Sequence, residues 1–143
     1  MEYLTLSPNA ISSDQREEID EWDAGLDLEE VDPVHPLHME IFNDLEDVME
    51  DEFSAFVTAF CDRAQGYADK LSSALDLDDY HTLQQTAHSL KGSSAQIGAV
   101  IVSSIAVRIE HLAQPENKIY LRKLITILHH ELNEAIALIK DNV

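Results

Sequence analysis

Apolar side chains recur at helical spacing through most of the chain from residue 39 onward. The pattern predicts a short helix over residues 39–49 and a second helix from Met49 to Leu75, about seven turns long if unbroken. Further helices are expected from Asp79 to Ile97, from Ala99 to Gln114, and along the apolar stripe from Leu121 to Ile139. Four long helices with short connections predict an all-α, up-down antiparallel four-helix bundle with a short additional N-terminal helix.

Residues that interrupt helices separate these segments. Asp76, Asp78 and Asp79 break the second pattern and are candidates for the N-cap of the third helix. Gly98 is expected to end the third helix, and Pro115 marks the turn before the last one. The sequence contains neither an alternating strand pattern nor an internal repeat, which fits a wholly helical fold.

The N-terminal part of the chain differs from the rest in composition. Residues 1–36 are strongly acidic and end in a proline-bearing stretch, Asp32 to Pro36, that is typical of a linker. We therefore predict an acidic, flexible extension over residues 1–36, dispensable for chemistry, and a helical bundle over residues 37–143. The alternative is a short amphipathic segment around Ile19 to Leu28 that docks on the bundle or on a partner.

The net charge narrows the choice of partners. The chain has a formal net charge of −19, and residues 1–52 contain 18 acidic side chains against one base, Arg16. Such a chain repels nucleic acids and anionic lipids, which argues against binding either. The single cysteine, Cys61, excludes an internal disulfide. Neither a signal peptide nor a membrane-spanning run occurs in the sequence, so we expect a cytoplasmic protein.

The third predicted helix has two faces of different kinds. One face is an apolar stripe that is expected to lie in the core: Leu83, Ala87, Leu90, Ser94 and Ile97. The opposite face contains no carboxylate in a chain with 28 acidic side chains. Its members are polar, cationic or small: His81, Gln84, Gln85, His88, Lys91, Gly92 and Ala95.

This second face has the side chains that a phosphoryl-accepting site needs. The imidazole of His88 is a nucleophile near neutral pH without help from a metal. Lys91, one turn later, can place an ammonium beside phosphoryl oxygens. Gly92 costs the helix about 1 kcal/mol relative to alanine, and its missing side chain leaves room for a partner at His88. The alternative interpretation is that His88 is an exposed helical histidine without a function. The neighbouring Lys91 and Gly92 disfavour this alternative.

These residues lie within a stretch, Ala87 to Ala99, that closely resembles the signature of histidine phosphotransfer (HPt) domains, AHxLKGSSxxxGA. Arg108-Ile109-Glu110 is similar to the family's continuation in its next helix. The resemblance covers roughly residues 38–140, with helix order and lengths agreeing, and the acidic extension departs from the family's pattern.

The resemblance implies roles for individual residues. His88 matches the phosphorylated histidine, Lys91 the lysine that stabilises the phosphoryl group, and Gly92 the glycine that admits a receiver domain. Glu110 matches an acid or amide that hydrogen-bonds the other ring nitrogen, although a surface ion pair is an alternative role. Gln96 could instead serve that polar role. The remaining residues expected to contact a receiver are His81, Gln84, Gln85, Ala95 and Gln96.

The implied function is phosphoryl transfer in a multistep phosphorelay: His88 accepts a phosphoryl group from a receiver-domain aspartate of a hybrid sensor kinase and passes it to a response-regulator receiver. The chain is expected to be a monomeric carrier without kinase activity and without a cofactor of its own, the Mg²⁺ lying on the receiver. One rival is a domain phosphorylated directly by ATP through a kinase in trans. The other is a non-catalytic adaptor that uses the acidic segment to sequester a partner.

Other reactive side chains receive structural interpretations. Ser93 and Ser94 have no base arranged for them, so they are expected to pack or to bond within the helix. No metal site is expected, because His35 and His38 flank a proline and the adjacent His129 and His130 point to different sides of a helix. Cys61 is expected to be a small core residue.

Overall fold

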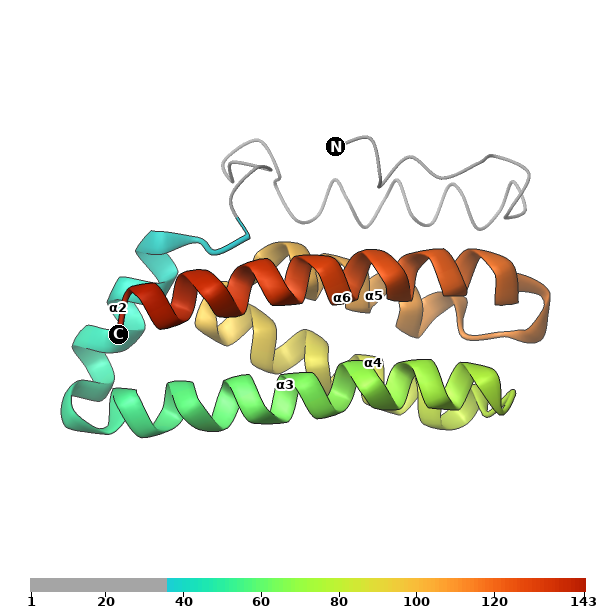
Figure 1. The fold of residues 1–143 in the computed structure, drawn as a ribbon, viewed down its shortest axis with the longest axis horizontal. Coiled ribbons are helices and arrows are strands. Elements are labelled where there is room, and N and C mark those ends of the chain that lie inside the picture. Colours follow the sequence, from blue (N-terminus) through green and yellow to red (C-terminus); the bar gives the residue numbers. More distant parts are fainter. Residues whose placement is uncertain (1–35) are drawn as a thin grey trace.

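The computed structural model describes residues 36–143, which form helices connected by short turns (Figure 1). The short helix α2 is followed by a 3-10 turn, η3, and the long helix α3; α4 and α5 come next, and a second 3-10 turn, η4, precedes α6. Their bounds are α2 Met39–Met49, η3 Glu50–Glu52, α3 Phe53–Asp76, α4 Tyr80–Ile97, α5 Val100–Leu112, η4 Pro115–Asn117 and α6 Lys118–Asp141.

The four long helices make the predicted bundle. α3 packs against α4 and α6, and α5 packs against the same two helices from the other side. Consecutive long helices run in opposite directions, and α2 lies across one end of the bundle, beside the C-terminus (Figure 1). The core between them is apolar, with Leu71, Leu90, Ile105 and Leu128 fully buried. The predicted fold class is confirmed.

The prediction that the second helix starts at Met49 is wrong. A 3-10 turn, η3, follows α2, and α3 starts at Phe53. Met49 ends α2, and Glu50 has φ 51° and ψ −119°, a conformation with positive φ that cannot continue a helix. The resulting bend turns α2 back onto the bundle, where the ring of Phe42 packs edge-on against Phe53 at a centroid distance of 5.1 Å. Burial of Phe42 favours the bend over one straight helix.

The predicted turns hold with one correction. Asp79 is the N-cap of α4, because its carboxylate accepts a hydrogen bond from the backbone N–H of Thr82 at 3.1 Å. The fourth helix ends at Leu112, two residues before the predicted Gln114. Gln114 is extended, with φ −143° and ψ 152°. A residue that precedes a proline avoids the helical region, and Pro115 therefore excludes Gln114 from α5.

Gly98 ends α4 and also contacts the start of α2. Its φ of 94° is the left-handed conformation that glycine adopts without strain. Its carbonyl accepts a hydrogen bond from the backbone N–H of His38 at 2.8 Å. A Cβ atom at Gly98 would lie 2.8 Å from the carbonyl oxygen of His38. Both observations show that the position requires glycine.

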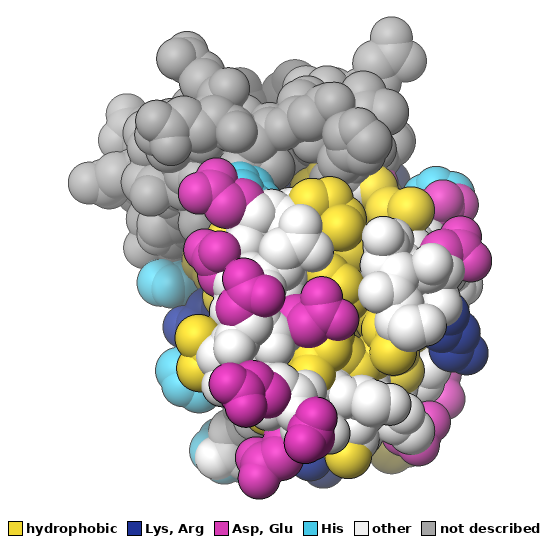
Figure 2. All heavy atoms as spheres, turned by 90° about the vertical axis from the view of Figure 1, so that its left-hand side faces the viewer, with side chains coloured by type: hydrophobic (Ala, Val, Ile, Leu, Met, Phe, Trp, Pro, Cys, Tyr) yellow, Lys and Arg dark blue, Asp and Glu magenta, His cyan; other side chains and the backbone are white. Residues whose placement is uncertain are grey.

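The end of the molecule formed by α2 and η3 is acidic. Figure 2 looks at this end and shows acidic side chains beside a strip of hydrophobic ones. The exposed carboxylates on these two elements belong to Glu40, Asp44, Glu46, Asp47, Glu50, Asp51 and Glu52. Among the described residues, the excess negative charge therefore gathers at one end of the bundle.

The predicted extension lies outside the described residues almost entirely. The structure begins at Pro36, which is buried together with Leu37. The hypotheses about residues 1–35, including the amphipathic segment from Ile19 to Leu28, concern residues that the structure does not describe. Within residues 36–143, no helix has the length and hydropathy needed to cross a membrane.

Candidate functional site

α4 separates its core stripe from an exposed face as the spacing predicts. The stripe residues Leu83, Ala87, Leu90, Ser94 and Ile97 are all buried, and Thr86, which the sequence analysis placed on neither face, is buried beside them. We call the opposite side the α4 face. Its exposed members are His81, Gln84, Gln85, His88, Gly92, Ala95 and Gln96, and Lys91 on the same side is half-buried.

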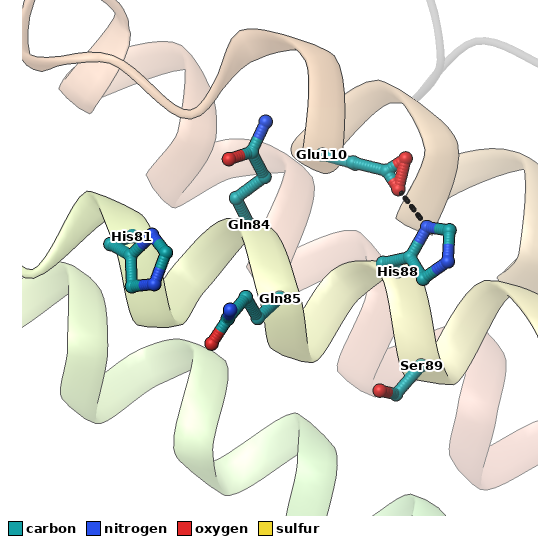
Figure 3. A pocket seen from close by; sticks show the side chains of 6 residues that line it. All are labelled: His81, Gln84, Gln85, His88, Ser89 and Glu110. Carbon is teal, nitrogen blue, oxygen red and sulfur yellow. Dashed lines mark hydrogen bonds and ion pairs between the residues drawn. The ribbon is translucent and has the colours of Figure 1, made fainter.

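His88 is held by a residue from the neighbouring helix. Its Nδ1 atom lies 2.7 Å from Oε2 of Glu110 on α5. The carboxylate can only accept, so the ring donates from Nδ1. The imidazole is 65% exposed, whereas Glu110 is only 14% exposed. Figure 3 shows the second ring nitrogen, Nε2, pointing away from Glu110. The pair therefore leaves the nucleophilic Nε2 lone pair directed outward.

Lys91 pairs with the same carboxylate. Its Nζ atom lies 3.3 Å from Oε1 and 3.5 Å from Oε2 of Glu110. Partial burial raises the pKa of Glu110, but the hydrogen bond from His88 and the charge of Lys91 outweigh it, and the net pKa lies below its ordinary value. Glu110 is therefore ionised throughout the neutral range. The sequence left two roles open for Glu110, a hydrogen bond to the imidazole and an ion pair. The structure shows both, the first with His88 and the second with Lys91.

The backbone around the site is fixed by the packing of α4 on α5. The hydroxyl of Ser103 on α5 donates to the backbone carbonyl of Lys91 at 3.0 Å. The left-handed turn at Gly98 brings α4 and α5 side by side, so that Glu110 on α5 lies next to His88 on α4. Sequence reasoning missed the Ser103 contact, for which the sequence contains no signal beyond a small polar residue in an apolar helix.

Gly92 faces open space. A Cβ atom at this position would meet nothing within 4 Å, apart from its own helix backbone. Packing inside the molecule therefore gives no reason for glycine, although glycine weakens a helix interior. A side chain here would project from the α4 face, one turn after His88, into the space that a partner would occupy.

An open hollow of about 590 Å³ lies on the α4 face (Figure 3). His81 stands two helical turns before His88, and both line it, while Glu110 contributes its wall from α5. The complete lining is His81, Gln84, Gln85, His88, Ser89 and Glu110. Each lining side chain carries a hydrogen-bonding group, which suits contact with a polar protein surface and leaves the histidine accessible for group transfer. Ser89 is a lining residue that the sequence analysis did not single out.

The remaining candidates take structural positions. The hydroxyl of Ser93 donates to the backbone carbonyl of Ser89 at 2.9 Å, a bond within the helix, and Ser94 is buried. Gln96 is exposed, and the imidazole of His88 is contacted by Glu110. Cys61 is buried, and burial raises the pKa of its thiol.

Two of the other histidines have roles in the fold. His38 caps α2, its Nδ1 accepting from the backbone N–H of Ile41 at 3.3 Å. His129 on α6 shares a hydrogen bond of 3.0 Å with Ser72 on α3. His35 lies outside the described residues. Over residues 36–143, no group of three potential ligands is arranged for a metal ion.

Comparisons with known proteins agree with this geometry. A family model, the Hpt domain, matches residues 55–141. The crystal structure of histidine-containing phosphotransfer protein B from Pseudomonas aeruginosa PAO1 is similar with a TM-score of 0.72 and 28% identity, over 76% of this chain and 95% of that one. A putative histidine-containing phosphotransfer protein from rice shares the fold with a TM-score of 0.67 and 18% identity, over 90% of this chain and 93% of that one.

No curated protein matches the chain in sequence. The matched family model spans more than half of the 143 residues and includes α4, α5, α6 and nearly all of α3. The His88–Glu110 pair and the α4 face all lie inside the matched region. On this evidence the chain belongs to the Hpt domain family.

Proposed function

We propose that this protein accepts a phosphoryl group on Nε2 of His88 from an aspartyl phosphate of a receiver domain and passes it to the aspartate of a second receiver. The observation that carries the proposal is the His88–Glu110 hydrogen bond, which directs Nε2 outward from a face without exposed carboxylates. Membership of the Hpt domain family supports phosphorelay function in general, and the choice of His88 rests on this geometry.

The transfer step balances without a mobile proton. The Nε2 lone pair forms the N–P bond, and the P–O bond of the aspartyl phosphate breaks with its electron pair leaving on the carboxylate. The imidazole thereby gains positive charge while its Nδ1 proton stays between the ring and Glu110. The nearby carboxylate stabilises that charge. Passage to the second receiver reverses these steps, with the neutral imidazole leaving.

The neighbouring residues divide the remaining tasks. Lys91 supplies a cation one turn from His88, and Gly92 leaves space for the receiver. His81, Gln84, Gln85, Ala95 and Gln96 provide the contact surface. Over residues 36–143, no three potential metal ligands lie together, and we expect the divalent cation of the reaction to be bound by the receiver. We expect the protein to act as a monomeric carrier that cannot phosphorylate itself from ATP.

A label-transfer experiment tests the proposal. A receiver charged with radioactive acetyl phosphate is mixed with the protein, and acid-labile label on the protein is measured. We expect label on the wild type and none on His88→Gln. His129→Gln, a matched variant on α6 that can still bond Ser72, should accept label normally. Label on His88→Gln, or none on the wild type with any receiver of the source organism, would refute the proposal.

The same assay separates the rivals. Direct phosphorylation by a kinase would give label from ATP and kinase in the absence of any receiver. A non-catalytic adaptor would bind receivers and accept label under neither condition. The carrier that we propose accepts label from charged receivers and loses it when an uncharged receiver is added.

A further inference from the structure

We propose that Glu110 is a carboxylate shared between two states of the site: Lys91 pairs with Glu110 in the unphosphorylated protein and moves to the phosphoryl group after transfer. This inference deepens the proposed function and rests on phosphorylation of His88. It assigns Glu110 a positioning role toward Lys91 in addition to its role toward the imidazole.

The geometry of the unphosphorylated site is the starting observation. One carboxylate serves both side chains, with Oε2 2.7 Å from Nδ1 of His88 and Oε1 3.3 Å from Nζ of Lys91. Glu110 is the least exposed of the three, at 14%, against 31% for Lys91. The ammonium is therefore held on the Nδ1 side of the ring, and the phosphoryl group would attach on the opposite side, at Nε2.

Phosphorylation changes the balance of charges around Lys91. The arriving group brings about two negative charges and three acceptor oxygens. At the same time the imidazole becomes positive, and its Nδ1–H donates a stronger hydrogen bond to the carboxylate of Glu110. Glu110 thus becomes a weaker partner for Lys91, while a stronger anion appears one helical turn away. The lysine has a flexible four-carbon stem, so its ammonium can change partner by side-chain rotation while the helix stays in place.

A consequence is that Glu110 competes with the phosphoryl group for Lys91. In the wild type, the gain from pairing Lys91 with the phosphoryl group is reduced by the loss of the Lys91–Glu110 pair. Replacing Glu110 with glutamine keeps a carbonyl that can accept from Nδ1 and removes the competing charge. Lys91 should then contribute more to the phosphorylated state in Glu110→Gln than in the wild type.

Lysine ammonium NMR tests the movement without any receiver. The ¹⁵N-labelled wild type and Glu110→Gln are recorded before and after phosphorylation by phosphoramidate, with the Lys91 Nζ signal assigned by its loss in Lys91→Met. We expect the two proteins to differ at Lys91 Nζ before phosphorylation and to converge afterwards, because the lysine then faces the phosphoryl group in both. A difference of unchanged size after phosphorylation would overturn the proposal.

Matched controls isolate the local effect. Glu134→Gln removes the same charge from an exposed position on α6, and it should leave Lys91 Nζ unmoved. The Nζ signal of Lys123, exposed on α6, should be the same in all samples. A shift at Lys91 in Glu134→Gln as large as that in Glu110→Gln would mean that net charge, and not the shared carboxylate, controls the signal.

An equilibrium cycle measures the competition. The phosphorylation equilibrium with a cognate receiver is determined for the wild type, Lys91→Met, Glu110→Gln and the double variant. Loss of Lys91 should shift it at least about twofold further in the Glu110→Gln background, the lower end of coupling between residues in contact. Equal shifts would overturn the proposal. A failure of the proposed function would give a different result. No receiver would then exchange phosphoryl groups with the protein, although the Lys91 Nζ signals would still converge after treatment with phosphoramidate.

Discussion

The Nδ1 atom of His88 and the Oε2 atom of Glu110 lie 2.7 Å apart, although the residues are 22 positions apart in the sequence and on different helices. The turn at Gly98 makes this possible, because it folds α5 back along α4. The histidine thereby receives an acceptor that its own helix cannot supply. Glu110 fixes the tautomer of an imidazole whose other nitrogen stays available to a partner.

Replacing His88 with glutamine should abolish phosphoryl transfer without unfolding the protein. The side chain is 65% exposed, and the core stripe of α4 does not include it. We expect the helical circular dichroism and the melting temperature to remain close to those of the wild type. A large drop in melting temperature would show instead that the His88–Glu110 bond is needed for folding.

Lys91→Ala should slow transfer or shorten the lifetime of phosphohistidine while receiver binding persists. Lys91 lies one helical turn after His88 and its ammonium pairs with Glu110, so Lys91→Ala removes a positive charge from the neighbourhood of the reacting group. Calorimetric titration with an uncharged receiver measures the affinity, and rapid-quench kinetics measures the transfer. Loss of affinity in proportion to loss of rate would contradict a role in chemistry.

Gly92→Gln should weaken receiver docking although it favours the helix by about 0.5–1 kcal/mol. Apart from its own helix backbone, nothing lies within 4 Å of a Cβ at this position, so the added side chain would project toward the partner. Gly66→Gln is the matched control, because Gly66 also lies inside a helix and also faces open space. Equal affinities of the two variants for a receiver would refute the role given to Gly92.

Gly98→Ala should destabilise the fold by about 1–3 kcal/mol, since alanine at φ 94° is strained. The added Cβ would also lie 2.8 Å from the carbonyl oxygen of His38. Urea unfolding measures the loss. Gly66→Ala, at an unhindered helix position, should instead stabilise the protein by about 0.5–1 kcal/mol. An unchanged free energy of unfolding in Gly98→Ala would mean that the start of α2 can shift away from the added Cβ without loss of stability.

Glu110 should make stability depend on pH in the acidic range. Its pKa in the folded protein lies below the ordinary value of 4.5, because the hydrogen bond from His88 and the charge of Lys91 outweigh its burial. A lowered pKa contributes stability that is present above the ordinary value and is lost as pH falls through the folded value. Glu110→Gln should therefore unfold with less dependence on pH in that range, measured by urea denaturation at several pH values.

The sequence predicts the bundle well because its apolar stripes are regular. The stripe of α4 from Leu83 to Ile97 is buried at each predicted position. The errors lie at helix ends, where tertiary contacts decide. The bend at Glu50 follows from the packing of Phe42 on Phe53, and no local pattern of the sequence reports that contact. The early end of α5 was accessible in principle, since Pro115 restricts the residue before it.

The site is predictable in part for a similar reason. Spacing along one helix places His88, Lys91 and Gly92 on a common face, so a sequence motif can report them. Contacts between helices can be predicted only when the register of α5 against α4 is known. The bond from Ser103 to the carbonyl of Lys91 and the pairing of Lys91 with Glu110 both depend on it. Glu110 could be suggested from the resemblance, but its simultaneous contact with two side chains could not.

Gly92 and Gly98, the two glycines within the motif, are under different selective pressures. Gly98 is required by the chain itself, because it holds a left-handed turn against the start of α2. A Cβ at Gly92 would meet nothing beyond its own helix backbone, so under the proposed function it is the docking of a partner protein that requires glycine there. A descendant that ceased to exchange phosphoryl groups would therefore be free to drift at Gly92 and would still retain Gly98. Comparing the two positions across a lineage would date the loss of the partner independently of the loss of the histidine.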